Sequence, residues 1–484
     1  MTISLRQLGP FLWEIPRQGG MKVPGRVYVA PRQIEGLRAD KSLEQVVNVA
    51  HLPGIVGASL AMPDIHWGYG FPIGGVAAVD AEHGAVSPGG VGYDINCGCR
   101  VVTTALHVDD VVPRIRDVVS KLFAAIPTGV GSNDAIPKLS RRELRELMAQ
   151  GAGWAVARGY RAGANDEDHT EEGGRLDGAE PGWVSDRALA RGASQVGTLG
   201  SGNHFLEVQR VAEIYDAEAA AAYGLRVGEV TLMIHSGSRG LGHQICDETL
   251  HDLSRTYARF GADYAALPDR QLACAPIASD AGQRYLGVMR AAANFAWANR
   301  QVMTGLAVRA VADALQIGEA EVGARLLYDV CHNIAKLEDH WVEGESRRVL
   351  VHRKGATRAF GPNDPRVPEA YRALGQPVLI PGDMGRYSFV LAGNAGAMTS
   401  TFGSSCHGAG RLLSRTAALK QARGRRIEEE LAARGIEVMA KGYRTLGEEM
   451  SEAYKDVEDV VDVIEGAGVS RKVAKLVPLG VIKG

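Results

Sequence analysis

The sequence contains no apolar run long enough to cross a membrane, and its amino terminus has no basic stretch followed by an apolar one. A spanning helix needs about 20 apolar residues, and a secretory signal needs both stretches. The chain also has only six cysteines among 484 residues, without a regular spacing. Few cysteines in a long chain are typical of reduced thiols rather than of a disulfide framework. We therefore expect no membrane association and a cytoplasmic location.

Two further absences concern nucleic acids and nucleotides. Lysine and arginine together number 54 and aspartate and glutamate 56, so the net charge is −2 and no overall basic field attracts RNA or DNA. Any nucleic-acid site must be a local basic patch. The sequence has no Walker A motif, no G-x-G-x-x-G motif and no G-x-S-x-G motif. It therefore does not predict a P-loop, a Rossmann nucleotide site or a nucleophile elbow. A bound nucleotide needs a different cradle.

Glycine is abundant, with 60 residues, and many of them lie in clusters next to short apolar, β-branched stretches. Such stretches predict strands, at 229–234, 347–352 and 377–380. The glycines predict tight turns, or places where the backbone approaches a ligand closely.

Between these stretches, composition and apolar spacing predict helices over 212–224, 284–316 and 408–434. The acidic segment 161–180 is expected to form a polar surface loop. The apolar run 477–482 predicts that the carboxyl-terminal tail, with Lys483, packs against the rest of the protein. Because there is no internal repeat and no long linker, we expect one large α/β or α+β domain over residues 1–484.

Several of the glycine-rich or polar stretches each contain a strong metal-binding side chain. They are Asp94 and Cys97 in GYDINCGCR, His204 in GSGNHFLE, His235 in LMIHSGS, His332 in YDVCHNIAK and His407 in SSCHGAGR. A lone histidine is usually a core or surface residue, but the repeated setting favours a shared metal site. Cys99 competes with Cys97, because the spacing leaves open which thiol points inward.

The types of these residues restrict the metal. A thiolate with several imidazoles and one carboxylate suits Zn²⁺, Mn²⁺, Fe²⁺ or Co²⁺ rather than Mg²⁺ or Ca²⁺. Two ions that share a bridging thiolate would use all of these groups, and two adjacent ions suit phosphoryl chemistry.

Basic residues lie close to the same stretches. Arg353, Lys354 and Arg358 surround a glycine turn in HRKGATRAF, and Arg411 follows the turn in SSCHGAGR. We interpret these four residues as candidates for binding phosphate or RNA.

A series of motifs in matching order resembles the RtcB family of RNA-splicing ligases. The resemblance runs from the region of Gly20 to the last residue, and its motifs are MPDIHWGYGFPIGG, GYDINCGCR, GTLGSGNHFLEV, HSGSRGLGH, CHNIAK, RKGATRAF, PGDMG, SSCHGAGR and the terminal KG. The family joins an RNA ending in a 2′,3′-cyclic phosphate or 3′-phosphate to an RNA with a 5′-hydroxyl, using GTP and Mn²⁺. The resemblance implies the same activity on tRNA halves or broken RNA ends, in tRNA splicing or RNA repair, with an archease-type activator as a further partner. It also implies a single large α/β domain with a central active-site cleft.

The resemblance also implies roles for individual residues. Two manganese ions would be bound by Asp94, Cys97, His204, His235 and His332. His407 would attack the α-phosphorus of GTP and carry GMP before its transfer to the RNA 3′-phosphate. Nucleotide contacts are implied for Asn203, His204, Phe205, Leu206, Glu207, His332, Asn333, Pro381, Gly382, Asp383, Met384, Ser388, His407, Gly408, Ala409, Gly410, Tyr454 and Lys483.

The small residues around His407 fit that role. An imidazole nucleophile needs one neutral, free nitrogen and room for a phosphorus in front of it. Gly408 and Gly410 leave that room, and their backbone N–H groups can meet phosphate oxygens. One departure concerns Asp383, which stands where the family's nucleotide turn often has a serine. Its carboxylate can accept hydrogen bonds from guanine or repel phosphate.

Two other functions remain open from the sequence. A metal-dependent phosphoesterase or cyclic phosphodiesterase would use the same ions without guanylylation, and it needs neither His407 nor Lys483. An RNA-binding or folding accessory protein with a structural metal fits less well, because structural sites are closed and need only four ligands.

Overall fold

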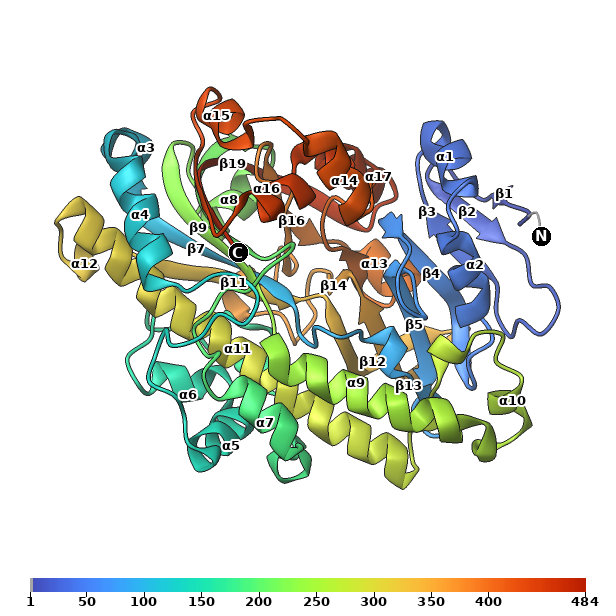
Figure 1. Cartoon of the computed structure of the whole chain (residues 1–484). Helices are drawn as coiled ribbons and strands as arrows, with labels where there is room; N and C mark the ends of the chain where they lie inside the picture. Colours follow the sequence, from blue (N-terminus) through green and yellow to red (C-terminus); the bar gives the residue numbers. More distant parts are fainter. Residues whose placement is uncertain (1–2) are drawn as a thin grey trace.

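The computed structural model describes residues 3–484, which form two large sheets with helices around them (Figure 1). The first sheet contains, in spatial order, β1 (Arg6–Gln7), β2 (Leu12–Ile15), β3 (Gly25–Tyr28), β4 (Ile55–His66), β5 (Ile73–Asp80), β13 (Glu345–Lys354) and β12 (Asn333–Val342). The second contains β11 (Arg325–Cys331), β7 (Gly98–His107), β9 (Glu229–Ser236), β8 (Phe205–Ile214), β19 (Ser470–Lys483), β16 (Ser388–Gly393) and β15 (Pro377–Ile380), and β18 (Glu437–Ala440) pairs with β19. Two small ribbons pair β14 (Ala356–Arg358) with β17 (Ser404–Cys406) and β6 (Ala85–Val86) with β10 (Ala275–Pro276).

The helices lie mostly outside the two sheets. In the amino-terminal half they are α1 (Ile34–Arg38), α2 (Ser42–Val49), α3 (Val108–Val111), α4 (Ile115–Ala125), α5 (Arg141–Gln150), α6 (Ala152–Val156), α7 (Asp186–Gly192) and α8 (Ala217–Tyr223). They continue with α9 (Arg239–Thr256), α10 (Ala262–Ala265), α11 (Asp280–Leu315), α12 (Glu319–Val322), α13 (Ala395–Ser400), α14 (Arg415–Ala422), α15 (Ile427–Ala432), α16 (Tyr443–Glu448) and α17 (Val457–Gly466). None of the helices in the described range 3–484 is both long and apolar enough to span a bilayer.

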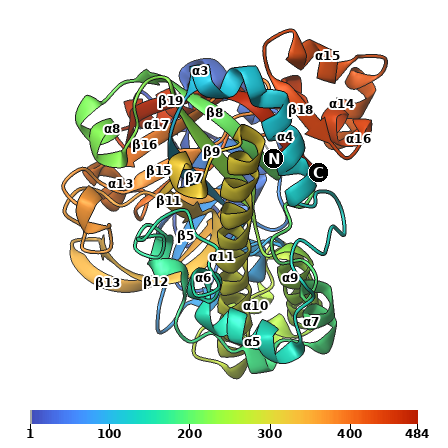
Figure 2. The same cartoon turned by 90° about the vertical axis from the view of Figure 1, so that its left-hand side faces the viewer.

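The longest helix, α11, is a buried scaffold element. Ser279 begins it by accepting a hydrogen bond from the backbone N–H of Gly282, and Gln316, with φ of 61°, ends it in the left-handed region. Its 36 residues are apolar or small around most of the circumference, which is the pattern of a helix enclosed on all sides. Figure 2 shows it running lengthwise through the molecule with α9 beside it. It packs against α4, α5, α6, α9 and β9.

The two sheets meet at a single residue of the chain. β11 of the second sheet ends at Cys331 and β12 of the first begins at Asn333, so only His332 separates them. The backbone N–H of His332 donates to the carbonyl of Cys97, at 2.8 Å. This junction places His332 beside the segment that carries Asp94 and Cys97.

The strand and helix predictions are confirmed where the apolar pattern is strong. β9, β13 and β15 cover the predicted strands, α11 covers the helix predicted over 284–316 except for its last residue, and the tail forms β19 with Lys483 only 4% exposed. The helix predicted over 212–224 is wrong in its first part, because β8 continues to Ile214 and α8 begins only at Ala217.

The single helix predicted over 408–434 is also wrong. The chain forms turns up to 414, then α14 and α15, which are separated around Gly424 with φ of +81°. A left-handed glycine cannot continue a helix, so the apolar spacing continues across a break.

The expectation of a surface loop over 161–180 is wrong for its centre. This segment forms turns and a short 3₁₀ helix rather than an α helix, but Glu171 is fully buried. Its carboxylate accepts a hydrogen bond from the backbone N–H of Cys331, at 2.8 Å, and another from Lys336 Nζ. Acidic composition predicted exposure, whereas this carboxylate is held inside by an amide and an ammonium.

Candidate functional site

One row of side chains crosses four neighbouring strands of the second sheet. Strand register places Lys483 of β19 opposite Phe205 of β8, Phe205 opposite His235 of β9, and His235 opposite Cys99 of β7. Residues directly opposite one another in a sheet lie on the same face. The fold therefore brings the last lysine of the chain to the edge of the candidate metal ligands.

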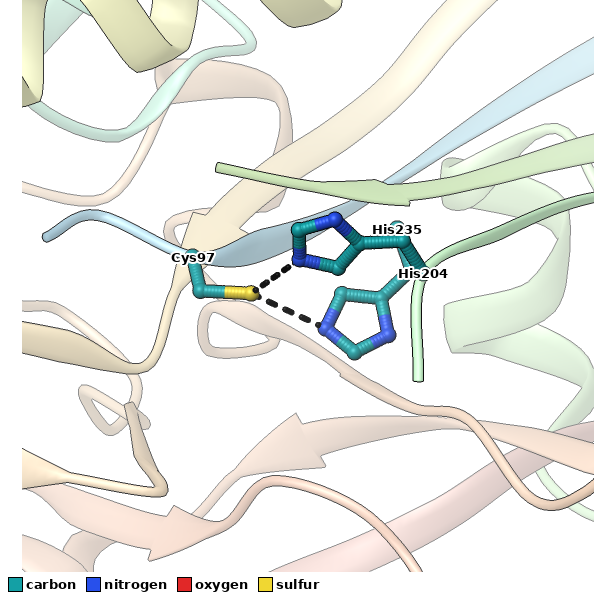
Figure 3. Close-up of side chains that lie close together, drawn as sticks. All are labelled: Cys97, His204 and His235. Carbon is teal, nitrogen blue, oxygen red and sulfur yellow. Dashed lines mark hydrogen bonds between the residues drawn. The ribbon is translucent and has the colours of Figure 1, made fainter. Parts of the chain in front are cut away.

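Five of the predicted metal ligands lie together in the structure. The Cys97 sulfur is 3.3 Å from His204 Nε2 and 3.2 Å from His235 Nε2 (Figure 3). Asp94 Oδ2 lies 2.8 Å from the same nitrogen of His204. His235 Nε2 lies 3.3 Å from His332 Nε2. Oxygen, sulfur and imidazole nitrogens thus converge in one place.

The electrostatics of this cluster suit a divalent cation. Burial lowers the pKa of His235 and of His332 well below the usual value, and the neighbouring imidazoles lower both further, so their rings stay neutral with lone pairs to offer. Burial and then the charge of Asp94 raise the pKa of the Cys97 thiol. That thiol becomes a thiolate only beside a positive charge, which a bound cation supplies.

Two observations test whether the residues present fit a metal. The Nδ1 atoms of His235 and His332 are buried and find no hydrogen-bond partner among residues 3–484. Two groups of donor atoms each lie within 4.8 Å of one another, namely Cys97 with His204 and His235, and Cys99 with His235 and His332. The donor set fits one or two divalent transition-metal ions, and Cys99 stays a second candidate thiol.

His407 follows β17 and is held by a carboxylate that the sequence analysis did not single out. Asp64 Oδ2 lies 2.6 Å from His407 Nδ1, and it also accepts the backbone N–H groups of His407, at 2.9 Å, and Gly408, at 3.3 Å. Because an ionised carboxylate only accepts, the neutral form of this ring carries its proton on Nδ1 and keeps the lone pair on Nε2. The His407 ring lies 4.8 Å, centre to centre, from the ring of His332.

A cavity of about 500 Å³ opens beside His407. Its lining includes many of the residues predicted to contact a nucleotide, namely Asn203, Phe205, Pro381, Gly382, Asp383, Met384, His407, Gly408, Ala409, Gly410, Tyr454 and Lys483. It also includes residues that the sequence analysis did not single out, among them His66, the half-exposed Trp67 and Glu449. The one sequence signal for Glu449 is its position five residues before Tyr454, which is a predicted nucleotide contact.

The remaining predicted nucleotide contacts lie behind the cavity wall. Leu206 points to the opposite face of β8 and packs in a hydrophobic core, so only its backbone can reach a ligand. Gln209 Nε2 donates to Glu207, at 2.8 Å, and to Ser388, at 3.2 Å, and the Ser388 hydroxyl accepts the backbone N–H of Gly382. Asn333 bridges the Asp94 carbonyl and the Gly355 N–H, at 3.1 and 3.0 Å. These residues support the lining.

Arg411 helps to build the wall of the cavity. Its guanidinium donates to Glu449, at 3.1 Å, to the Tyr454 hydroxyl, at 3.0 Å, and to the carbonyls of Leu413 and Glu448. The Tyr454 hydroxyl in turn donates to Glu449. With these acceptors in place, the Arg411 charge positions Tyr454 and is largely compensated.

The predicted phosphate-binding patch at 353–358 needs correction. Arg353 and Arg358 are buried, at 0% and 2% exposure. Arg353 makes two hydrogen bonds to Glu338, at 2.6 and 2.8 Å, and Arg358 pairs with Glu172 at 2.5 Å. Glycine beside basic residues predicted an exposed turn, but the carboxylates of Glu338 and Glu172 already neutralise both guanidinium groups.

Lys354 is buried as well. Its ammonium donates to the carbonyls of Tyr69 and Gly89, and burial lowers its pKa to about 8. Two of its three donors are thus directed to backbone carbonyls rather than to an exposed phosphate site.

A second hollow, of about 380 Å³, lies on another side of Asp94. Arg191, Arg239 and His243 line it, with Tyr93. Arg239 Nη1 lies 3.4 Å from His204 Nδ1, which ties this basic surface to the metal-ligand cluster. These residues were not predicted from the sequence, although HSGSRGLGH contains Arg239 and His243.

Comparison with known proteins gives the same picture over the whole chain. The family model described as tRNA-splicing ligase RtcB matches residues 45–484. A protein of Thermococcus kodakarensis named tRNA-splicing ligase RtcB is 51% identical over 483 residues, covering 100% of this chain and 99% of that protein. An Archaeoglobus fulgidus protein of the same name is 51% identical, with 99% of each chain covered. A Mycobacterium tuberculosis protein named RNA-splicing ligase RtcB is 51% identical over 91% of this chain and 100% of its own length. With its cavity, nucleophile candidate and ligand cluster formed by the matched segments, the chain belongs to the RtcB family.

Proposed function

We propose that this protein is a GTP-dependent RNA ligase that joins an RNA 3′-phosphate to an RNA 5′-hydroxyl. A 2′,3′-cyclic phosphate would first be opened by water. One observation carries the proposal: His407, with Nε2 left free by its bond to Asp64, lines a nucleotide-sized cavity beside the metal-ligand cluster. The names of the relatives support the same activity, and tRNA halves or other broken RNA ends are the proposed substrates.

In the first proposed step, His407 Nε2 attacks the α-phosphorus of GTP. The N–P bond forms as the bond to the bridging oxygen breaks, and pyrophosphate leaves. Asp64 keeps the Nδ1 proton in place and its negative charge stabilises the imidazolium that develops. Gly408 and Gly410 leave the approach to Nε2 open.

The buried end of the cavity supplies groups that match guanine. The Lys483 ammonium is buried above the Phe205 ring, with 5.6 Å from Nζ to the ring centre, and such an ammonium can donate to guanine O6 and N7. Tyr454, held by Arg411 and Glu449, offers an aromatic face for stacking. Glu207 follows Phe205 by two residues on β8, so it lies on the same face of the sheet as Lys483 of β19 and supports this end of the cavity from behind its wall.

In the next proposed steps, an oxygen of the RNA 3′-phosphate displaces His407 from the GMP phosphorus, which forms a mixed anhydride. The 5′-hydroxyl of the second RNA then attacks the 3′-phosphorus and expels GMP. Asp94, Cys97, His204, His235 and His332 would hold two divalent ions, proposed to be Mn²⁺, which supply charge neutralisation and activate the attacking hydroxyl. The hollow with Arg191, Arg239 and His243 is the local basic patch by which an RNA end can reach this cluster.

Intact-mass spectrometry after incubation with GTP and Mn²⁺, followed by peptide mapping, tests the proposal. We expect a gain of one GMP on the peptide that contains His407. His407→Ala should gain none and keep near-normal metal content, whereas His251→Ala, exposed on α9, should behave like the wild type. If metal-loaded protein forms no adduct yet releases phosphate from RNA ends, the protein is a phosphoesterase instead.

A further inference from the structure

Arg300, in the middle of α11, is completely buried and all five of its N–H groups have acceptors. Nε donates to Asp329 Oδ2, at 2.8 Å, and Nη2 to Asp329 Oδ1, at 2.7 Å, and to Asn96 Oδ1, at 3.0 Å. Nη1 donates to two backbone carbonyls, of Asn96 at 2.7 Å and of Ser236 at 2.9 Å. A guanidinium has a rigid fork of donors, so this set fixes the acceptors relative to one another.

Each acceptor of Arg300 lies close to a candidate metal ligand in sequence. Asn96 precedes Cys97, and Ser236 follows His235. Asn96 has φ of 52°, a left-handed conformation that is uncommon outside glycine, and its side chain is tied to α11 again by a 2.7 Å bond to the Ala293 carbonyl. The helix therefore holds the turn that presents Cys97 from two points.

The neighbouring Asn299 does the same for the remaining loops. Its Oδ1 accepts the N–H groups of Gly197, at 2.7 Å, and Thr198, at 3.2 Å, while its Nδ2 donates to the Gly237 carbonyl, at 3.2 Å. The Leu199 carbonyl, next in that loop, contacts His204 Nδ1 at 3.0 Å. Asn299 thus links the segment behind His204 to the segment after His235.

We propose that the Asn299–Arg300 pair of α11 is a positioning device that sets the spacing of Cys97, His204 and His235 before metal binds. The proposal rests on the proposed metal centre. α11 is the suitable reference for this task, because it is long, enclosed and packed against several other elements. Neither side chain contacts a donor atom directly. Each acts on the proposed metal centre by holding the backbone segments that carry the ligands.

Arg100 offers a matched control. It is also fully buried and donates to the same Asp329 oxygen, at 2.8 Å, but its other bonds go to Gln301, Thr304 and Thr170 rather than to the ligand segments. Arg300→Met and Arg100→Met therefore each remove one buried arginine that pairs with Asp329 and leave the other in place. They differ in the contacts to Asn96 and Ser236.

The test is titration of metal-free protein with Co²⁺, followed by the thiolate-to-cobalt absorption band and the ligand-field spectrum. We expect Arg300→Met to weaken Co²⁺ binding by about 10- to 100-fold and to change the spectrum, because the ligands lose their spacing. Arg300→Lys should rescue little, since one ammonium cannot reach acceptors on three segments. Arg100→Met should retain the wild-type spectrum.

Unfolding midpoints of the metal-free variants separate positioning from plain stability. If Arg300→Met fails to fold, Asn299→Ala keeps the charged network and should still weaken Co²⁺ binding and alter the spectrum. The inference is overturned if Arg300→Met and Arg100→Met have equal Co²⁺ affinities and equal spectra. Where Arg300→Met does not fold, the same comparison is made between Asn299→Ala and Arg100→Met. A wild-type protein that binds Co²⁺ without a thiolate band would instead overturn the proposed metal centre.

Discussion

One carboxylate oxygen organises the proposed nucleophile at the scale of single residues. Burial alone would raise the pKa of Asp64, but the charge and hydrogen bonds of His407 outweigh it and hold that pKa below its usual value. Lys455 adds to this by donating to the carbonyls of Pro63 and Ile65, on either side of Asp64, each at 2.9 Å. The carboxylate therefore stays ionised and keeps the proton on His407 Nδ1.

The two cysteines near the metal-ligand cluster should differ in their effect on metal content. Cys97 contacts His204 and His235 directly, whereas Cys99 belongs to the group with His235 and His332 and packs in a hydrophobic core. We expect Cys97→Ala to lower both the bound Mn²⁺ and the RNA ligation activity strongly. Cys99→Ala should lower both much less. Metal analysis of the purified variants measures this. Equal losses would show that both thiols bind or that Cys99 is the ligand.

Glu207 gives a prediction about pH. Burial raises the pKa of its carboxyl to about 8 from an ordinary 4.5, and the Gln209 hydrogen bond and the Lys483 charge offset only part of this. Between these values the folded protein holds a proton that the unfolded chain releases, so stability falls as pH rises, by up to about 1.4 kcal/mol per pH unit. Glu207→Gln removes this effect.

We therefore expect the free energy of unfolding of Glu207→Gln, relative to the wild type, to increase from pH 6 to pH 8. Urea unfolding of the metal-free proteins measures it. The exposed Glu213, six residues further along β8, supplies the control variant Glu213→Gln, which should show no such trend. Parallel pH profiles for all three proteins would mean that Glu207 is already ionised in the folded state.

At the scale of elements, the turn after β17 decides where His407 stands. Gly410 has φ of +74°, and a Cβ there would lie 2.4 Å from the Asp64 carbonyl oxygen. Gly408 has an ordinary φ, and its Cβ would lie 3.4 Å from the Pro381 carbonyl oxygen. The two glycines of one motif thus have different reasons to be glycine.

Gly410→Ala should destabilise the protein and displace His407 from Asp64, at a cost of about 1–3 kcal/mol for the backbone alone. Gly408→Ala should leave the unfolding midpoint nearly unchanged and instead slow adduct formation with GTP, because its methyl group enters the cavity. Thermal unfolding and intact-mass time courses separate the two effects. A Gly410→Ala protein with normal stability and normal adduct formation would contradict this account of the turn.

At the scale of the whole molecule, the proposed metal centre exists only when segments far apart in the chain are packed together. Its residues extend from Asp94 to His332: four lie in or just before strands β7, β8 and β9 of the second sheet, and His332 lies at the junction between β11 and β12. A metal that binds this native arrangement and not the unfolded chain must stabilise the fold, by about 2.7 kcal/mol at a free concentration 100 times Kd.

We therefore expect Mn²⁺ to raise the unfolding temperature of the metal-free protein and a chelator to reverse the rise. Cys97→Ala should show little of this shift. Calorimetry at fixed protein concentration and several Mn²⁺ concentrations measures it. A shift of equal size in Cys97→Ala would place the stabilising ion elsewhere.

The sequence alone determined the family, the strongly patterned elements and the residue types of the site. Motifs such as GYDINCGCR and SSCHGAGR are local, and the apolar spacing over 284–316 predicts α11 because helix periodicity is a local property. Asp64 and His407 are 343 positions apart, and no local pattern links them.

Only the tertiary structure brings that pair together, and strand pairing within each sheet aligns Lys483 with Phe205 and places Arg353 beside Glu338. Composition predicted Arg353 and Arg358 as exposed and 161–180 as a surface loop, because charge is usually solvated. The tertiary structure decided otherwise by supplying partners of opposite charge for these groups, and partners distant in sequence are determined by how sheets and helices pack rather than by local spacing.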